Sequence, residues 1–261
     1  MKRRVAGLVV AFVVVGCRPI DGGVVVRTDV PATSVPASAT AIPSATGASV
    51  DFVLQEYPVA RGQGPHDVAP ARDGGVWYTA QLSGELGWLD PKSGAMAVFD
   101  APRGAGPYGI ASCPDGEIYY ASLAGNYVGR IVKETGGATV LVPPTAGQGA
   151  RRAWCDSKSH IWVSEWNAGQ LARYDGSSWK EWKLPGNNPM AYAVFVDDAD
   201  IVWVTDWGAN ALERFDPATE TFVVRTHPSP NANVRELLGR HGEVWGAMSG
   251  QDKLVVARPA G

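Results

Sequence analysis

Short apolar stretches with an aromatic residue in second position recur along the chain between residues 76 and 247. Each stretch is bounded by Gly, Asn or Asp, which is typical of β-strands joined by tight turns. No long stretch with a helical period follows residue 16. The pattern therefore predicts an all-β protein. The five stretches are Val76–Thr79, Ile118–Ala121, Ile161–Ser164, Val202–Thr205 and Val244–Ala247.

The first aromatic residues of these stretches recur at intervals of 42, 43, 41 and 42 residues. They are Trp77, Tyr119, Trp162, Trp203 and Trp245. A repeat of this length, with four short strands in each unit, is typical of one propeller blade. We therefore predict a five-bladed β-propeller of four-stranded antiparallel blades. An open β-sandwich is the competing fold, and it would not explain so regular a period.

The fifth repeat ends after its third strand, at residues 254–256. A stretch with the pattern of an outer strand, residues 52–58, precedes the first repeat instead. We expect this N-terminal strand to pair with the last blade and close the ring, because closure removes exposed strand edges.

Residues 1–16 have the features of a secretory signal peptide. Lys2, Arg3 and Arg4 precede twelve apolar or small residues, too few to span a bilayer. Gly16 then precedes Cys17 as in a bacterial lipobox, which predicts lipidation at Cys17, and an ordinary signal peptide with an unmodified cysteine is the alternative. Residues 17–49, rich in Pro, Ala, Ser and Thr, are expected to be a disordered tether to a propeller at residues 50–261. The chain is thus expected to be an exported lipoprotein of the cell envelope.

Charge and composition exclude some partners. With 23 basic and 26 acidic residues the net charge is −3, and the basic cluster lies at the extreme N-terminus, so no nucleic acid is expected. Contact with a membrane is expected through the lipid anchor only. No pair of His has metal-ligand spacing and no Cys-x-x-Cys occurs, so neither a metal site nor a cofactor is expected.

Two sets of positions are expected to line the central channel. The starts of the first strands carry His66, Tyr108, Arg151 or Arg152, Met190 and Arg235. The ends of the second strands carry Ala80, Ser122, Glu165, Asp206 and Met248. A His with two carboxylates suits acid–base chemistry, which makes His66, Glu165 and Asp206 the catalytic candidates. Arginines and aromatic rings suit an anionic ligand, which makes Tyr108, Arg151, Arg152, Arg235, Trp166 and Trp207 the binding candidates. The alternative is that Glu165 and Asp206 merely neutralise the arginines.

Cys113 and Cys155 lie in the first strands of neighbouring repeats, at opposite parity. In an oxidising envelope a disulfide between them is one expectation, and two buried thiols are the other.

The repeat motif resembles the virginiamycin B lyase (streptogramin B lyase) family over about residues 50–258. The matching segments are Gly106–Ile110, Asn126–Ile131, Trp203–Asn210 and Val244–Met248. The resemblance implies a lyase that opens a cyclic depsipeptide antibiotic by elimination at its ester linkage, with Mg²⁺ as cofactor and a seven-bladed ring.

The family's functional positions carry other residues in this chain. The catalytic His and the Glu before it correspond to Arg235 and Asn233, a second metal-binding Glu corresponds to Ser249, and a further His corresponds to Met190. An arginine stays protonated and cannot act as a base at neutral pH. We therefore expect a module that binds a small molecule, a glycan or a partner protein. The alternative is a diverged lyase of the streptogramin type, or another propeller enzyme, and Mg²⁺ belongs only to the lyase alternative.

Overall fold

The computed structural model describes residues 54–104, 106–133 and 135–258. The expected signal peptide, Cys17 and the expected tether lie outside these residues. The chain divides into two units, residues 1–54 and residues 55–261, and all the described strands lie in the second unit. Within the described part, no helix is long and apolar enough to cross a membrane.

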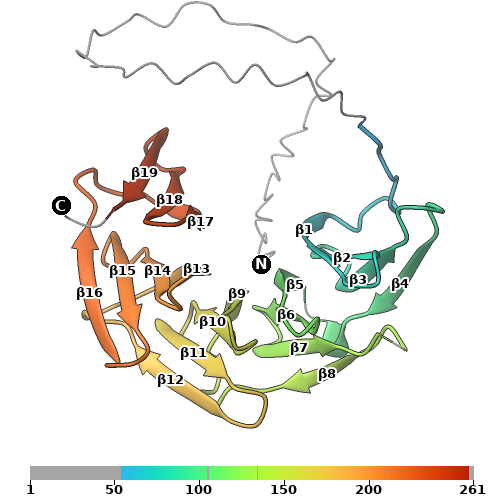
Figure 1. The fold of residues 1–261 in the computed structure, drawn as a ribbon, viewed down its shortest axis with the longest axis horizontal. Coiled ribbons are helices and arrows are strands. Elements are labelled where there is room, and N and C mark those ends of the chain that lie inside the picture. Colours follow the sequence, from blue (N-terminus) through green and yellow to red (C-terminus); the bar gives the residue numbers. More distant parts are fainter. Residues whose placement is uncertain (1–53, 105, 134, 259–261) are drawn as a thin grey trace, which may run out of the picture. The chain divides into compact units, whose positions relative to one another are not determined.

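Five antiparallel sheets account for the described strands, and each sheet is built from strands that follow one another in sequence (Figure 1). The first sheet contains β1 (Pro65–Pro70), β2 (Val76–Ala80), β3 (Glu85–Leu89) and β4 (Met96–Asp100), followed by a short 3-10 helix, η1 (Pro102–Gly104). The second contains β5 (Pro107–Ser112), β6 (Ile118–Ser122), β7 (Tyr127–Ile131) and β8 (Ala138–Leu141). The third contains β9 (Ala150–Cys155), β10 (Ile161–Glu165), β11 (Gln170–Tyr174) and β12 (Trp179–Lys183). The fourth contains β13 (Ala191–Val196), β14 (Val202–Asp206), β15 (Ala211–Asp216) and β16 (Thr221–Thr226), and the fifth contains β17 (Val234–Arg240), β18 (Glu243–Met248) and β19 (Lys253–Ala257).

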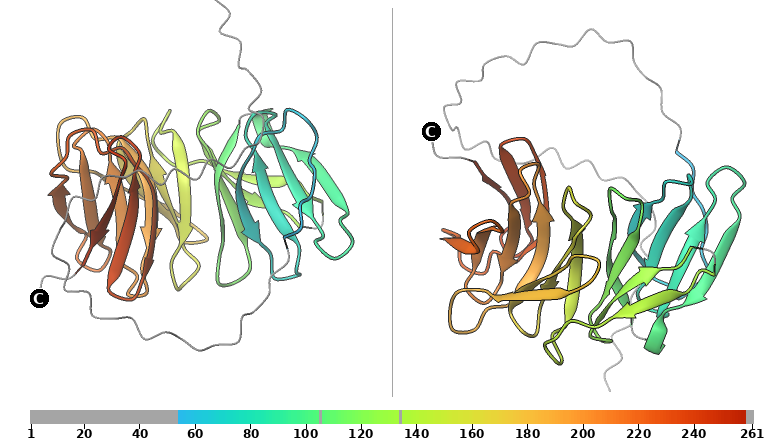
Figure 2. Two further views of the ribbon diagram at one scale, coloured as in Figure 1. Left: turned by 90° about the horizontal axis from the view of Figure 1, so that it is seen from above. Right: turned by 60° about the horizontal axis from the view of Figure 1, so that its bottom comes forward.

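The sheets of the second unit stand side by side like blades around a common centre (Figures 1 and 2). The first strand of each sheet lies innermost and packs on the first strand of the next, β1 on β5, β5 on β9, β9 on β13 and β13 on β17. Among the described residues, β17 and β1 make no comparable contact. The expected all-β, propeller-like architecture is confirmed, with four sheets of four strands and one of three.

The aromatic anchors hold neighbouring sheets together. Trp162 is fully buried and stacks on Trp182 at 5.4 Å between ring centroids, and Phe215 of the next sheet packs edge-on against Trp162 at 5.9 Å. A turn carboxylate orients the ring, because Trp162 Nε1 donates to Asp156 Oδ2 at 3.0 Å. The same arrangement recurs in the fourth sheet, where Trp203 donates to a turn aspartate at 2.8 Å. The 42-residue period thus reflects one aromatic ring on the second strand of each sheet, which is buried in the first three sheets and half-buried in the last two.

The expected closing strand is not confirmed. Residues 54–64 are described and form no strand, while residues 52 and 53 lie outside the described residues. Tyr57 instead lies against the first sheet, where its hydroxyl donates to the carbonyl oxygen of Pro91 at 2.7 Å. The fifth sheet contains three strands, and β18 is the hydrogen-bonded neighbour of β19 in it.

The second and third sheets are linked covalently. Cys113 follows β5, Cys155 ends β9, and the two form a disulfide with their Cα atoms 5.3 Å apart. The bond lies in the apolar layer between the sheets, beside Tyr119 and Val163. The disulfide thereby links the ends of the inner strands β5 and β9, which carry Tyr108 and Arg151.

Candidate functional site

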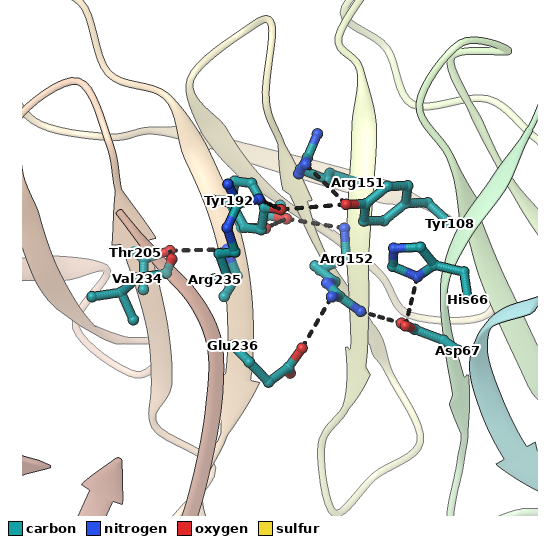
Figure 3. Close-up of polar contacts among 12 residues, drawn as sticks. His66, Asp67, Tyr108, Arg151, Arg152, Tyr192, Thr205, Val234, Arg235 and Glu236 are labelled. Carbon is teal, nitrogen blue, oxygen red and sulfur yellow. Dashed lines mark hydrogen bonds and ion pairs between the residues drawn. The ribbon is translucent and has the colours of Figure 1, made fainter. Parts of the chain in front are cut away.

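The first strands bring five side chains to the centre of the sheets (Figure 3). Each first strand begins with a residue paired to the last residue of the second strand, as Pro65 pairs with Ala80 and Ala191 with Asp206. The next residue along each first strand is central, and these residues are His66, Tyr108, Arg151, Tyr192 and Arg235. The sequence analysis had named four of these five positions, with Arg151 given as an alternative to Arg152.

Tyr192 takes the central position that the sequence assigned to Met190. The interval from Tyr192 to its anchor Trp203 equals the interval from His66 to Trp77, so counting from the anchors would have found it. The proline at residue 189 misled the assignment, because it lies two residues further from its anchor than Pro65 does. Met190 contributes its backbone instead, with its N–H donating to Asp206 Oδ1 at 2.8 Å.

The guanidinium of Arg151 lies among three aromatic rings. Its Cζ is 3.8 Å from the ring centroid of Tyr192, 4.5 Å from that of Tyr108 and 5.1 Å from that of Trp166. Its Nη2 donates to the Tyr108 hydroxyl at 3.0 Å. Within the described ranges no carboxylate pairs with Arg151. Its charge is stabilised by ring faces and phenol oxygens.

Arg235 approaches the same cluster from β17. Its Nη1 donates to the Tyr192 hydroxyl at 3.1 Å, and its Cζ lies 5.0 Å from the ring centroid of Trp207. Trp207 stacks on Tyr192 at 4.4 Å with the rings nearly parallel. Arg235 is exposed, and it too has no carboxylate partner among the residues that the structure describes.

Arg152, by contrast, is neutralised by two carboxylates. Its Nη1 pairs with Asp67 Oδ2, and its Nη2 lies 3.1 Å from Glu236 Oε2. These two carboxylates raise the pKa of Arg152 even though burial opposes its charge. The sequence analysis offered Glu165 and Asp206 as the groups that neutralise the arginines. In the structure, Asp67 and Glu236 pair with Arg152 instead.

His66 has one carboxylate neighbour. Its Nδ1 lies 2.7 Å from Asp67 Oδ1, and its ring lies 4.1 Å from the ring of Tyr108 between centroids. Asp67 therefore contacts both His66 and Arg152. A carboxylate on Nδ1 favours the tautomer that leaves Nε2 as the proton acceptor.

Glu165 and Asp206 occupy other surroundings. Both are fully buried at the ends of their strands, and no contact among the described residues joins either to His66. Glu165 accepts a hydrogen bond from Gln170 Nε2 at 2.6 Å, and burial raises its pKa to about 8. Asp206 Oδ1 accepts backbone N–H groups, including that of Gly208 at 2.7 Å.

The phenols of Tyr108 and Tyr192 differ in their tendency to ionise. Their oxygens lie 3.3 Å apart. Burial and the hydrogen bond to Tyr192 raise the pKa of Tyr108. Burial also opposes ionisation of Tyr192, but hydrogen bonds from Tyr108, Arg151 and Arg235 outweigh it and lower the pKa of Tyr192. Tyr192 is thus the hydrogen-bond acceptor at the middle of the cluster.

The centre does not suit Mg²⁺. This ion needs oxygen ligands with net negative charge, but the carboxylates of Asp67 and Glu236 are both bound to Arg152. Arg235 Nε donates to the Ser249 hydroxyl at 2.9 Å, which places a further cation at the centre. Within the described residues no group of three or more His, Cys, Asp or Glu could hold a metal ion.

Antiparallel sheets arranged as blades, with their first strands meeting at a shared centre, define a protein of the β-propeller type. The sequence profile of the virginiamycin B lyase family matches residues 44–255, so the chain belongs to that family. No protein in the curated set matched the sequence.

Two solved structures of lyases share the fold. A catalytically inactive virginiamycin B lyase from Staphylococcus aureus with quinupristin superimposes with a TM-score of 0.74 at 22% identity, over 80% of this chain and 74% of that one. A streptogramin B lyase superimposes with a TM-score of 0.70 at 23% identity, over 77% and 67% of the two chains. The nidogen/laminin complex contains a chain with a TM-score of 0.59 at 12% identity, over 77% and 78%. Identities this low establish the fold alone.

Proposed function

We propose that this chain is a binding module of the cell envelope that takes its ligand at the centre of the sheets. The observation that carries the proposal is the pair Arg151 and Arg235, two cations held by aromatic rings without a carboxylate partner among the described residues. Polar groups that converge within an aromatic surround are the usual features of a ligand site.

The binding proposal is tested by thermal unfolding of the full-length chain with a panel of small organic acids, neutral oligosaccharides and muropeptides. At least one class should raise the melting temperature of the wild-type chain. Trp207→Ala should lose that effect, whereas Trp179→Ala, far out on β12, should keep it. No stabilisation by any class, or equal stabilisation of both variants, would contradict the proposal.

A carbon–oxygen lyase is the second candidate function. Family membership favours it, and so does the contact of His66 with Asp67, which leaves one ring nitrogen as a proton acceptor. The other two catalytic candidates, Glu165 and Asp206, are buried away from His66 and do not strengthen it.

The two functions are separated by incubating the chain with quinupristin, with and without Mg²⁺, and following ring opening by mass spectrometry. The binding proposal predicts no turnover. Turnover that His66→Ala abolishes and His241→Ala preserves would establish the lyase instead. His241 is a suitable control because it is exposed and pairs with Asp198.

We further propose export and anchoring through a lipid on Cys17, which rests on the basic start, the short apolar stretch and Gly16 before the cysteine. Cells grown with a clickable palmitate analogue should label the wild-type chain, and Cys17→Ser should abolish the label and release the protein from the membrane fraction. A membrane-bound, unlabelled wild-type chain would contradict the proposal.

For ring closure, we keep residues 52–58 as the candidate fourth strand of the fifth sheet, a role that requires Tyr57 to leave the position beside Pro91 that it takes in the described structure. The reasoning is that the other four sheets each have a fourth strand. If so, deleting residues 50–58 should accelerate hydrogen exchange at the β19 amides and leave those of β15 unchanged. Equal exchange in both chains would show that β19 is a natural edge.

A further inference from the structure

We propose that the ligand of the central site is an oxyanion, a carboxylate or a phosphate, attached to a flat ring. The inference rests on the proposed binding function and deepens it. It assigns the anion to Arg151 and Arg235 and the flat ring to the exposed parts of Trp166, Trp207 and His66.

The charge balance at the centre favours an anion. Three guanidinium groups contact one pair of tyrosines. Arg151 and Arg235 donate to the hydroxyls of Tyr108 and Tyr192, and Arg152 Cζ lies 5.2 Å from the ring centroid of Tyr108. Asp67 and Glu236 supply two carboxylates, and both bind Arg152. The three guanidinium groups and the two carboxylates thus leave a net charge of +1 at the centre, and the direct contacts of Arg151 and Arg235 within the described structure are to neutral phenols, a hydroxyl and ring faces.

The guanidinium groups also have donors to spare. An arginine carries five N–H donors. Arg235 uses Nε on Ser249 and Nη1 on Tyr192, while Arg151 uses Nη2 on Tyr108 and also donates to Tyr192. Arg151 Nε is buried and has no hydrogen-bond partner in the described part of the chain. Two guanidinium groups with unused N–H donors suit the several acceptor positions of a carboxylate or phosphate.

Aromatic surfaces border these two guanidinium groups. Trp166 and Trp207 meet edge to face at 5.5 Å and remain half-buried, as does His66, whose ring lies 4.1 Å from that of Tyr108. Aromatic cages usually recognise cations, but here Arg151 already lies over the face of Tyr192 at 3.8 Å. A second cation would be repelled, so the remaining aromatic surface favours a flat, uncharged ring that carries the anionic group.

The test is isothermal titration calorimetry of the full-length chain with benzoate, phenyl phosphate, benzamide and inorganic phosphate. Benzoate or phenyl phosphate should bind at least about tenfold more tightly than benzamide, the effect of one charge-assisted hydrogen bond. The same compound should bind more tightly than inorganic phosphate, because only it has the ring. Whichever of the two binds better identifies the anionic group as carboxylate or phosphate.

Variants assign the effect to residues. Arg235→Gln should lower the affinity for the preferred anion by about tenfold and leave benzamide unchanged. Arg225→Gln is the matched control, because Arg225 is an exposed arginine on β16 whose Nη1 donates only to the neighbouring carbonyl of Val224. Circular dichroism verifies that both variants fold.

Two outcomes would overturn the inference. If benzamide binds as tightly as benzoate and Trp207→Ala abolishes both, the centre binds rings without regard to charge, and the binding function stands while the anion is wrong. If none of the aromatic probes binds at concentrations up to about 10 mM, the anion site is rejected. The broader ligand panel then decides alone whether the chain has the proposed binding function.

Discussion

Arg152 and Glu236 face each other across the centre of the sheets, with guanidinium Nη2 3.1 Å from carboxylate Oε2. Arg152 lies on β9 of the third sheet and Glu236 on β17 of the fifth, while Asp67 on β1 pairs with the same guanidinium. Because β1 and β17 do not pack on each other, Arg152 is what joins the first and last sheets at the centre of the described structure. The charge of Arg152 thus holds the first, third and fifth sheets together at the centre. Arg151 and Arg235 have no carboxylate partner among the described residues.

Removing the negative charge of Asp67 tests this central link. Asp67→Asn should lower the free energy of unfolding by about 1–3 kcal/mol, because Arg152 is largely buried and would lose half of its compensation. Urea unfolding followed by tryptophan fluorescence measures the change. Glu220→Gln breaks an exposed, solvent-screened pair with Lys180 and should lower the free energy of unfolding much less. Equal effects of the two variants would show that the central link has no special weight.

Gly109 allows β5 to approach the arginine strand. A Cβ at this position would lie 2.8 Å from Arg152 Cα and 3.0 Å from the Arg151 carbonyl oxygen. Gly109→Ala should therefore push β5 and β9 apart, cost about 1–3 kcal/mol of stability and weaken ligand binding. The control is Gly137→Ala, whose Cβ would lie 3.4 Å from a single threonine oxygen. Unaltered stability of Gly109→Ala would mean that the strands can separate without cost.

Glu213 makes stability depend on pH. Burial, with Asp206 nearby, raises its pKa to about 8, whereas in the unfolded chain it ionises near about 4.3. The folded protein therefore holds more protons between these values, so the stabilisation is complete below about pH 4 and is lost as the pH rises towards 8. Each such group contributes a slope of up to about 1.4 kcal/mol per pH unit.

Glu213→Gln should flatten that slope and be more stable than the wild-type chain near pH 8. Urea unfolding at a series of pH values from 5 to 9 measures it. The buried Glu165, whose pKa is also raised to about 8, should maintain part of the slope in the variant. An unchanged slope would show that Glu213 ionises normally in the folded protein.

The disulfide between Cys113 and Cys155 should contribute about 3–4 kcal/mol, because it restricts the unfolded chain over a separation of 42 residues. Replacing both cysteines with Ala should lower the melting temperature by the amount that corresponds to this loss of free energy. Circular dichroism measures the change. Reduction with dithiothreitol should destabilise the wild-type chain and have no effect on the double variant. Alkylation of both cysteines in the unreduced, denatured protein would show that they are free thiols.

Ionisation of Tyr192 should compete with an anionic ligand. Its pKa is lowered by the hydrogen bonds that it accepts, so its phenolate forms at a lower pH than that of an ordinary tyrosine and then compensates Arg151 and Arg235 itself. Affinity for benzoate should fall as the pH rises towards that pKa. Tyr192→Phe should remove this alkaline loss, and calorimetric titrations between pH 7 and 10 measure it. A loss that persists in Tyr192→Phe would assign it to another group.

The anchors and the turns were sufficient to predict the blades. Trp77, Tyr119, Trp162, Trp203 and Trp245 mark one second strand in each sheet, because a strand buried between two sheets needs a large apolar ring at a constant place. His66, Tyr108 and Arg151 share one interval of eleven residues to their anchors, whereas Arg235 lies ten residues before Trp245. Met190 was wrong because a proline was given more weight than the interval to the anchor.

The ion-pair partners of the central residues could not be located by counting from the anchors. Asp67 lies 85 residues before Arg152 in sequence, and Glu236 is equally remote on the other side. Which carboxylate reaches which arginine depends on side-chain length and on how the sheets are spaced around the centre. Glu165 and Asp206 looked equally suitable in the sequence, but both are fully buried, where Glu165 binds Gln170 and Asp206 accepts backbone N–H groups.

By itself, the sequence determined the class of fold, the number of repeats and the strand that supplies each central residue, because periodic burial leaves a local and regular signal. Tertiary structure alone decided that Arg152 is neutralised while Arg151 and Arg235 are not. That distinction depends on contacts between sheets one, three and five, and the electrostatic energy of a guanidinium depends on distances across space that no local pattern encodes.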